Sequence, residues 1–317
     1  MSKQKEAEAC AFKTSIGGQA LIEGILMRGP TKQSIVVMTA DGPVSKVEEP
    51  HFIREKHKFL GWPLVRGVVT YVESMTYGVK ALTYSAEFLP EDEQEEPSKF
   101  DKWVEDKFGT EKAEKFIIGV AVFLGICLSL GLFIFLPTFL VGLIPGLEGL
   151  ITLRSLLEGL CKMIIFFAYL AAMSKMKDVA RLFGYHGAEH KAIFCYEKGL
   201  ELTVENVRKQ SRFHPRCGTS FLLVVVVLGI LVGFLIQVDN MFLRMGMRLL
   251  LLPLLVGVAY ELNRWAGRHD NWFTKLITAP GKALQKLTTV EPDDKMIECG
   301  IEALKLVIPE EDGADRW

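Results

Sequence analysis

The sequence of 317 residues lacks a surplus of either charge, a Cys-x-x-Cys pair and an apolar segment at its start. Its 37 basic and 38 acidic residues leave a formal net charge of −1, which excludes a polybasic nucleic-acid binder. The first 15 residues are polar, so no signal peptide is expected. With six cysteines and no Cys-x-x-Cys pair, reduced thiols are expected rather than disulfides.

What the sequence does contain is clustered hydrophobicity. Half of its residues are hydrophobic, and mean hydropathy is positive although 24% of the residues are charged. Residues 116–136 form an uncharged run that, at about 1.5 Å per residue, can cross a hydrocarbon core of about 30 Å. Three shorter candidates follow: residues 156–173, which carry Glu158 and Lys162, residues 220–236, and residues 246–262. The sequence therefore predicts about four transmembrane helices.

The distribution of lysine and arginine predicts an orientation for these helices. Residues 1–115, 174–219 and 263–317 hold 33 of the 37 basic residues. Because cytoplasmic segments of membrane proteins are enriched in such residues, we expect both termini and the middle loop to face the cytoplasm. The predicted location is the cell membrane, with several passes through the lipid bilayer.

The predicted fold class is membrane α-helical with a cytoplasmic α+β N-terminal domain. Residues 1–115 form this domain, with a hairpin made by strands at 34–39 and 44–47 around Asp41-Gly42, a helix at 62–88, and an acidic linker at 91–96. Residues 116–262 form the four-helix region with its basic loop at 174–219. Residues 263–317 form a tail of amphipathic helices, the first interrupted near Pro280-Gly281 and the second starting after Pro292.

The basic loop contains three of the six histidines and carries the main chemical motif. His186 and His190 are four residues apart, so on a helix they share a face and can hold one ion, most plausibly zinc. Glu189 lies between them and is a candidate general base for a metal-bound water. This His-x-x-Glu-His spacing is that of inverted zinc proteases. Alternatively, these residues form a polar network on a cytoplasmic helix and bind no metal.

The third metal ligand has three candidates. In inverted zinc proteases it is a distant downstream glutamate, a part that Glu261 could take. His214 and Cys217, from the same loop, are chemically suitable zinc ligands as well.

Four further polar residues are weaker site candidates. Arg216 and the basic loop could attract anionic lipid headgroups or phosphate. Gln19, Glu23 and Arg28 are polar residues within an apolar N-terminal stretch, where surface positions on strands explain them equally well. No phosphate loop is expected, because no Gly-Lys-Ser/Thr follows Gly17-Gly18-Gln19.

Three segments together resemble one protein family. GGQALIEGILMRGP near the start, GYHGAEHKAI with HPRCGTSFL in the middle, and LTTVEPDD near the end resemble the YqhQ-like family of bacterial membrane proteins of unknown function. Its members are often labelled as predicted metal-dependent enzymes, and the resemblance implies a bacterial inner-membrane protein. It supplies no established reaction. Peptidase activity is not implied, since inverted zinc proteases are large soluble enzymes.

Two functional hypotheses follow from these observations. The first is a metal-dependent hydrolase that acts on a membrane-embedded or membrane-adjacent substrate. The second is a non-enzymatic scaffold or assembly factor that binds another membrane complex through its cytoplasmic segments. A transporter has less support, because no internal repeat is apparent.

Overall fold

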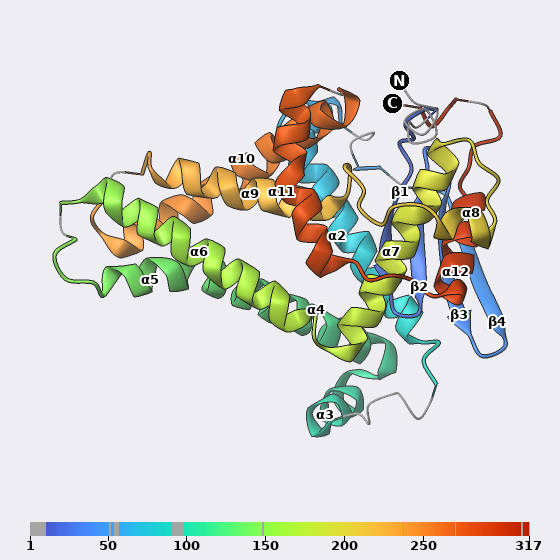
Figure 1. Cartoon of the computed structure of the whole chain (residues 1–317). Helices are drawn as coiled ribbons and strands as arrows, with labels where there is room; N and C mark the ends of the chain where they lie inside the picture. The colour runs from blue at the N-terminus through green and yellow to red at the C-terminus, as the bar shows by residue number, and fades with distance from the viewer. Residues whose placement is uncertain are drawn as a thin grey trace. The chain divides into compact units, whose positions relative to one another are not determined.

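The computed structural model describes residues 11–50, 52–53, 57–90, 98–147, 149–236, 238–269, 271–311 and 313–316. The predicted acidic linker at 91–96 lies outside these ranges. The chain forms two compact units, coloured along the sequence in Figure 1. Unit 1 comprises Met1–Leu89, Leu170–Val227 and Pro253–Trp317, and unit 2 comprises Pro90–Tyr169 and Leu228–Leu252.

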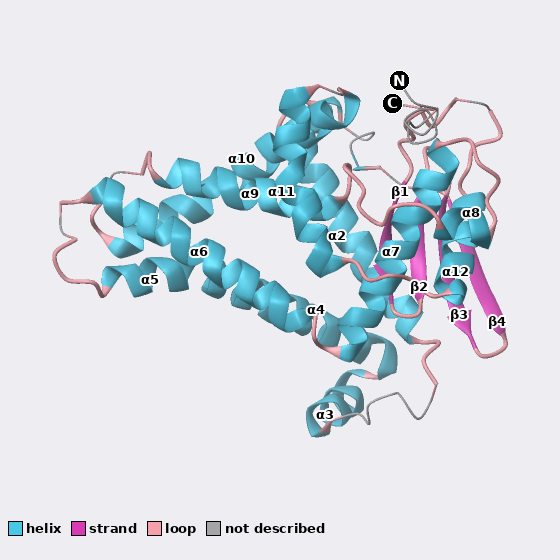
Figure 2. Ribbon diagram, in the orientation of Figure 1, coloured by secondary structure: helices cyan, strands magenta, loops and turns pink. Residues whose placement is uncertain are grey.

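Unit 1 is built on one antiparallel sheet of four strands, shown in magenta in Figure 2. The strands are β1 (Gly17–Leu21), β2 (Gly24–Arg28), β3 (Gln33–Thr39) and β4 (Gly42–Glu48), and each pairs with the next. The predicted hairpin is confirmed as β3 and β4. Its turn requires Gly42, whose φ of 121° is unfavourable for residues with a side chain.

Helices cover both faces of this sheet. Side chains alternate between the faces of a strand, so Ile25 and Met27 face one layer while Leu26 faces the other. Helices α7 (Lys177–Glu197) and α12 (Asp294–Lys305) pack on the first face, and α2 (Val65–Ala86) packs on the second. The predicted N-terminal domain, basic loop and tail therefore contribute to one hydrophobic core.

The other described helices of unit 1 are short or lie in the tail. They are the 3₁₀ turn η2 (Lys58–Gly61), α8 (Val204–Arg208) and α11 (Trp272–Thr288). The predicted interruption near Pro280 is wrong, since α11 continues through it. At Gly281 the helix approaches Ser220 so closely that an added Cβ would lie 2.5 Å from the Ser220 Cβ.

Unit 2 contains helical segments, several of them apolar. It includes α3 (Lys99–Phe108), α4 (Thr110–Leu130), the π-helical turn η3 (Gly131–Phe135) and α5 (Leu136–Gly142). Three helices have residues in both units, namely α6 (Ile151–Met173), α9 (Gly218–Gly233) and α10 (Met241–Arg268).

Three helices of the described chain are long and apolar enough to cross a membrane: Lys112–Gly142, Ile151–Met173 and Met241–Arg268. The remaining predicted span, residues 220–236, corresponds to α9, whose 16 residues extend only about 24 Å at about 1.5 Å per residue. Large apolar side chains on these helices are exposed, such as Ile164 (69%) and Leu250 (79%). Apolar surface of this extent indicates membrane association.

Candidate metal centre

The candidate metal centre is built on α7, which places His186 and His190 on one face as their spacing predicts. Their ring centroids are 4.4 Å apart. Close packing against the α11–α12 connection depends on Gly187, because a Cβ there would lie 2.3 Å from the Val290 carbonyl oxygen. This glycine therefore lets the backbone near Thr288 reach the first histidine.

Two backbone carbonyls orient the imidazole rings. His186 Nδ1 lies 2.8 Å from the Thr288 carbonyl oxygen, and His190 Nδ1 lies 2.6 Å from that of Arg212. A carbonyl oxygen only accepts hydrogen bonds, so this geometry assigns the proton to Nδ1 in both rings. In the neutral form of each ring the lone pair is then on Nε2, as it is in histidines that bind metals.

Cys217 brings a sulfur atom to these two nitrogens. Its Sγ lies 3.2 Å from His186 Nε2, and the backbone N–H of Thr219 is directed at the same sulfur from 3.4 Å. One ring nitrogen of each histidine and the Cys217 sulfur lie within 4.8 Å of one another. His190 Nε2 is buried and has no hydrogen-bond partner in the described part of the chain. Two imidazole nitrogens and a thiolate at this spacing suit tetrahedral zinc.

Glu189 is buried between α7 and the first strand. One of its carboxylate oxygens accepts a hydrogen bond of 2.9 Å from the backbone N–H of Gly18. Burial raises the pKa of Glu189, while the nearby His186 and the Gly18 N–H oppose that rise. A Cβ at Gly18 would lie 3.1 Å from the Glu189 carboxyl carbon, so the Gly17-Gly18 motif provides room for this carboxylate.

The structure does not bring Glu261, the candidate suggested by inverted zinc proteases, together with the histidines. Its carboxylate accepts two hydrogen bonds from the guanidinium of Arg66, and the bond from Arg66 Nε has a length of 2.6 Å. Among the described residues, the group with metal-ligand spacing contains His186, His190 and Cys217. The sequence could not identify Arg66 as the partner, because 195 residues separate it from Glu261.

His214 lies beside the candidate centre but belongs to another network. Its Nε2 lies 3.5 Å from a Glu197 carboxylate oxygen and 3.4 Å from an Arg216 guanidinium nitrogen. Burial lowers the pKa of His214 to about 4. The backbone of His214 is held at both its N–H and its carbonyl by the side-chain amide of Gln285, each at 2.7 Å.

Arg216 forms an ion pair with Glu197, which is fully buried. Glu197 also accepts a hydrogen bond of 2.9 Å from the backbone N–H of Thr14. Burial alone would raise the pKa of Glu197. His214, Arg216 and the Thr14 N–H together outweigh this effect, so the pKa of Glu197 is lowered. Arg216 is thus engaged within unit 1.

The three N-terminal candidates also have packing partners. Glu23 receives two hydrogen bonds from Arg181 and one of 3.1 Å from the Tyr185 hydroxyl. The Arg28 guanidinium lies over the aromatic ring of Tyr77, 5.7 Å from its centroid. Gln19 lies against Gly78 of α2, where an added Cβ would lie 2.3 Å from its amide oxygen.

The functional groups that sequence reasoning missed are mainly backbone atoms. The carbonyls of Thr288 and Arg212 orient the rings, and the N–H of Gly18 binds Glu189. Every residue except proline carries a backbone N–H and every residue a carbonyl, so residue type gives no signal for these contacts. In the sequence, the glycine between the two histidines, Gly187, is the one residue whose type could have suggested that another backbone segment packs closely there.

Comparisons with known proteins identify relatives without assigning a reaction. A family model described as protein of unknown function (DUF1385) matches residues 62–310. The uncharacterized protein YqhQ of Bacillus subtilis (strain 168) is 33% identical over 313 residues, covering 96% of this chain and 93% of that protein. No solved structure matches the chain. The predicted resemblance to the YqhQ-like family is therefore confirmed.

Proposed function

Because the chain belongs to the DUF1385 family, whose function is unknown, we propose a function from the geometry of unit 1: it binds a divalent transition metal ion. The ligands are His186 Nε2, His190 Nε2 and Cys217 Sγ, and zinc is the ion that best suits them. Of the three alternatives for the third ligand, this proposal selects Cys217.

The observation that carries the proposal is the orientation of the two imidazoles. Both Nδ1 atoms face carbonyl oxygens, His186 Nε2 lies 3.2 Å from the Cys217 sulfur, and His190 Nε2 is buried without a hydrogen-bond partner in the described part of the chain. A buried ring nitrogen without a hydrogen-bond partner is costly, by about 1–3 kcal/mol. A metal ion bound by His190 Nε2 would remove that cost.

The proposal extends to catalysis through the number of ligands. Structural zinc sites have four protein ligands, whereas catalytic sites have three and leave a position for water. The three protein ligands found among the described residues therefore favour a catalytic site, and we propose that it hydrolyses a substrate close to the membrane. Glu189, next to His190 on α7, is the proposed general base, and its bond to the Gly18 N–H would hold the carboxylate in place.

We also propose that the apolar helices cross the cytoplasmic membrane, with both termini in the cytoplasm. The three long apolar helices and the shorter apolar helix α9 would together make an even number of crossings, and the distribution of basic residues supports cytoplasmic ends. Labelling of single-cysteine variants with a membrane-impermeant thiol reagent tests it. Labelling near the chain's ends in intact cells would contradict it.

Metal analysis of the purified full-length protein tests the metal centre. We expect about one zinc ion per chain, falling at least about tenfold in His190→Ala and in Cys217→Ser. His269→Ala and Cys127→Ser are matched controls, because both residues are exposed and lie outside the candidate centre. Wild-type protein without stoichiometric metal, or equal loss in variants and controls, would contradict the proposal.

A second measurement separates hydrolysis from metal binding. We expect the zinc-loaded protein to hydrolyse p-nitrophenyl acetate faster than Glu189→Gln, by about 100-fold or more. The glutamine variant keeps a side-chain oxygen for the Gly18 N–H, so zinc content should be unchanged. Equal rates with equal zinc content would exclude Glu189 as the base and favour the non-enzymatic alternative, a membrane scaffold or assembly factor.

A further inference from the structure

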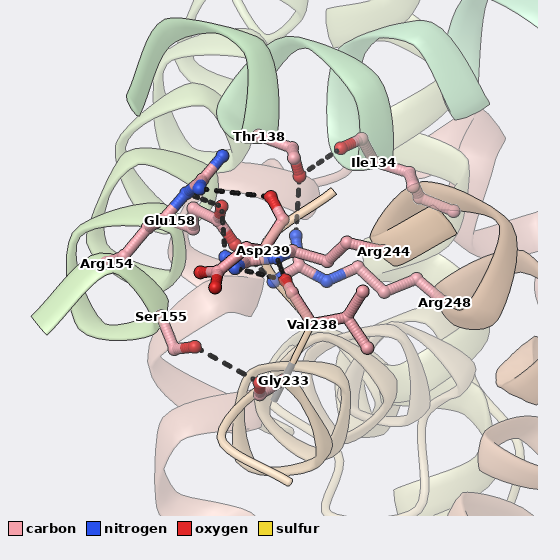
Figure 3. Close-up of polar contacts among 10 residues, drawn as sticks. All are labelled: Ile134, Thr138, Arg154, Ser155, Glu158, Gly233, Val238, Asp239, Arg244 and Arg248. Carbon is pink, nitrogen blue, oxygen red and sulfur yellow. Dashed lines mark hydrogen bonds and ion pairs between the residues drawn. The ribbon is translucent and has the colours of Figure 1, made fainter. Parts of the chain in front are cut away.

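Unit 2 buries a group of charged side chains near the starts of two apolar helices (Figure 3). Arg154 and Glu158 lie in the first two turns of α6, and Arg244 and Arg248 occupy the same positions in α10. Glu158, Arg244 and Arg248 are 1%, 0% and 8% exposed. We call Arg154, Arg244 and Arg248, together with Glu158, the arginine cluster.

Glu158 is the ion-pair partner of all three arginines. One carboxylate oxygen lies 3.0 Å from Arg244 Nη1 and 3.5 Å from Arg154 Nε, and the other accepts a hydrogen bond from Arg248 Nη2. Each oxygen of this single carboxylate is therefore already close to at least one guanidinium.

Neutral oxygens take up part of the remaining hydrogen-bonding capacity. The Val238 carbonyl accepts bonds of 2.9 Å and 2.6 Å from Arg244, and the Asp239 carbonyl accepts one of 3.4 Å from Arg154. Arg248 Nη1 donates to the Thr138 hydroxyl at 2.5 Å. These contacts satisfy donors, but they do not neutralise charge.

The cluster keeps a surplus of positive charge. Three guanidiniums face one carboxylate in the ion pairs of the described residues. Counting the Asp239 carboxylate, whose backbone carbonyl lies at the cluster, still leaves three positive charges against two negative charges. The half-buried Lys162, one turn after Glu158, increases the surplus. Such a surplus is costly in a low-dielectric region unless an anion joins it.

Two guanidinium nitrogens of the cluster keep hydrogen-bonding capacity. Arg248 Nε and Arg154 Nε are buried and have no hydrogen-bond partner in the described part of the chain, although Arg154 Nε lies 3.5 Å from the Glu158 carboxylate. The starts of α6 and α10 add the positive ends of two helix dipoles at the same group of side chains.

We propose that the arginine cluster binds a phosphate group. Guanidiniums pair with two phosphate oxygens at once, so an oxyanion suits unused donors on neighbouring arginines. The eighth residues of α6 and α10 lie only about 10 Å from the helix starts, at about 1.5 Å per residue. This depth is close to the membrane interface, where the phosphate comes from a lipid headgroup or from free phosphate. The inference does not depend on the metal centre.

Titration calorimetry of the delipidated full-length protein in detergent tests this site. The probes are inorganic phosphate and, separately, short-chain phosphatidylglycerol. We expect wild-type protein to bind at least one of them. The Arg248→Gln variant should bind that probe with an affinity lower by about tenfold or more. Arg264→Gln, which makes the same change near the other end of α10, should bind as wild type does.

The two probes distinguish the source of the phosphate. Binding of phosphatidylglycerol that inorganic phosphate displaces assigns a lipid headgroup, and binding of inorganic phosphate alone assigns the free anion. Wild-type protein that binds neither probe would overturn the proposal, as would equal weakening in Arg248→Gln and Arg264→Gln.

A second readout covers the case in which Arg248→Gln does not fold. Inorganic phosphate should raise the melting temperature of wild-type protein more than sodium chloride does at equal ionic strength. Arg248→Lys, which keeps the charge but loses the planar fork, should show a smaller rise. A melting temperature of wild-type protein that neither inorganic phosphate nor short-chain phosphatidylglycerol raises would overturn the site.

Discussion

The candidate metal centre of unit 1 and the arginine cluster of unit 2 are both buried and polar. The metal centre has a surplus of electron-pair donors, whereas the arginine cluster has a surplus of positively charged hydrogen-bond donors. The metal centre brings a ring nitrogen from each of two histidines and a sulfur within 4.8 Å of one another, while the cluster surrounds one carboxylate with three guanidiniums. Lone pairs without donors favour a cation, and donors without enough negative charge favour an anion.

The difference teaches how a buried polar site indicates its ligand. In both regions most polar atoms have a hydrogen-bond partner among the described residues, and the atoms that have none there are the informative ones. His190 Nε2 is such an atom in the metal centre, and Arg248 Nε is one in the arginine cluster. Their chemistry, an acceptor in the first case and a charged donor in the second, gives the sign of the ligand.

Replacement of the cluster's carboxylate should have the largest effect. Glu158→Ala leaves three guanidiniums without it and should reduce the free energy of unfolding by about 3–5 kcal/mol, measured by reversible SDS titration. Inorganic phosphate should restore part of this loss. Glu114→Ala, at an exposed position of α4, is the control. A loss as small as that of the control would show that Glu158 does not hold the cluster together.

Removal of the metal should be the next largest effect. If the zinc concentration is about 100 to 1,000 times the dissociation constant, a chelator should lower the free energy of unfolding by about 3–4 kcal/mol. Cys217→Ser should respond much less, and Cys127→Ser should respond as wild type does. Thermal melting with and without chelator measures this. If the chelator lowers the melting temperature of both variants equally, Cys217 does not bind the metal.

A change at Gly187 tests the packing that positions the metal centre. Gly187→Ala places a methyl group 2.3 Å from the Val290 carbonyl oxygen and should destabilise the protein by about 1–3 kcal/mol in chemical denaturation. Zinc affinity should fall as well, because the displaced segment includes Thr288. Gly17→Ala, with open space at its Cβ, is the matched control. Unchanged zinc affinity in a destabilised variant would show that Thr288 does not orient His186.

The smallest effect concerns acid sensitivity at Glu197, a buried carboxylate that also pairs with arginine. Its lowered pKa means that it contributes stability above its ordinary pKa of 4.5 and loses that contribution as pH falls. Glu197→Gln should therefore be less stable than wild type at pH 7, and the gap should narrow below about pH 4.5. One proton limits the slope of the difference to about 1.4 kcal/mol per pH unit. Denaturation curves across pH measure it, and a gap independent of pH would contradict this role.

Much of the local structure follows from the sequence. The turn at Gly42, the strands beside it and the helical spacing of His186 and His190 depend on residues near each other in the chain. Three of the four apolar runs form helices long enough to cross a membrane. The third metal ligand was left among three candidates, because the partner of each residue lies far away in sequence.

The arginine cluster shows the same limit in the membrane-associated part. Glu158 and Lys162 stand out in the sequence as charges within an apolar run, and at four residues apart they can neutralise each other or face a partner helix. The structure shows that Glu158 faces a partner helix, because it pairs with two arginines of α10 that lie more than 80 residues away. Packing of α10 against α6 creates these contacts, and one helix alone cannot reveal them.

The sequence by itself determines the apolar helices, the hairpin, the histidine face of α7 and membership of the family. Each depends on local spacing, residue type or motif order, all of which can be read along the chain. Only the tertiary structure decided that Glu261 pairs with Arg66, that His214 lies beside Glu197, and that Cys217 meets the two histidines. The physical reason is that folding gives some side chains a partner from a distant part of the chain. Only the side chains that folding leaves without such a partner are available to bind a ligand.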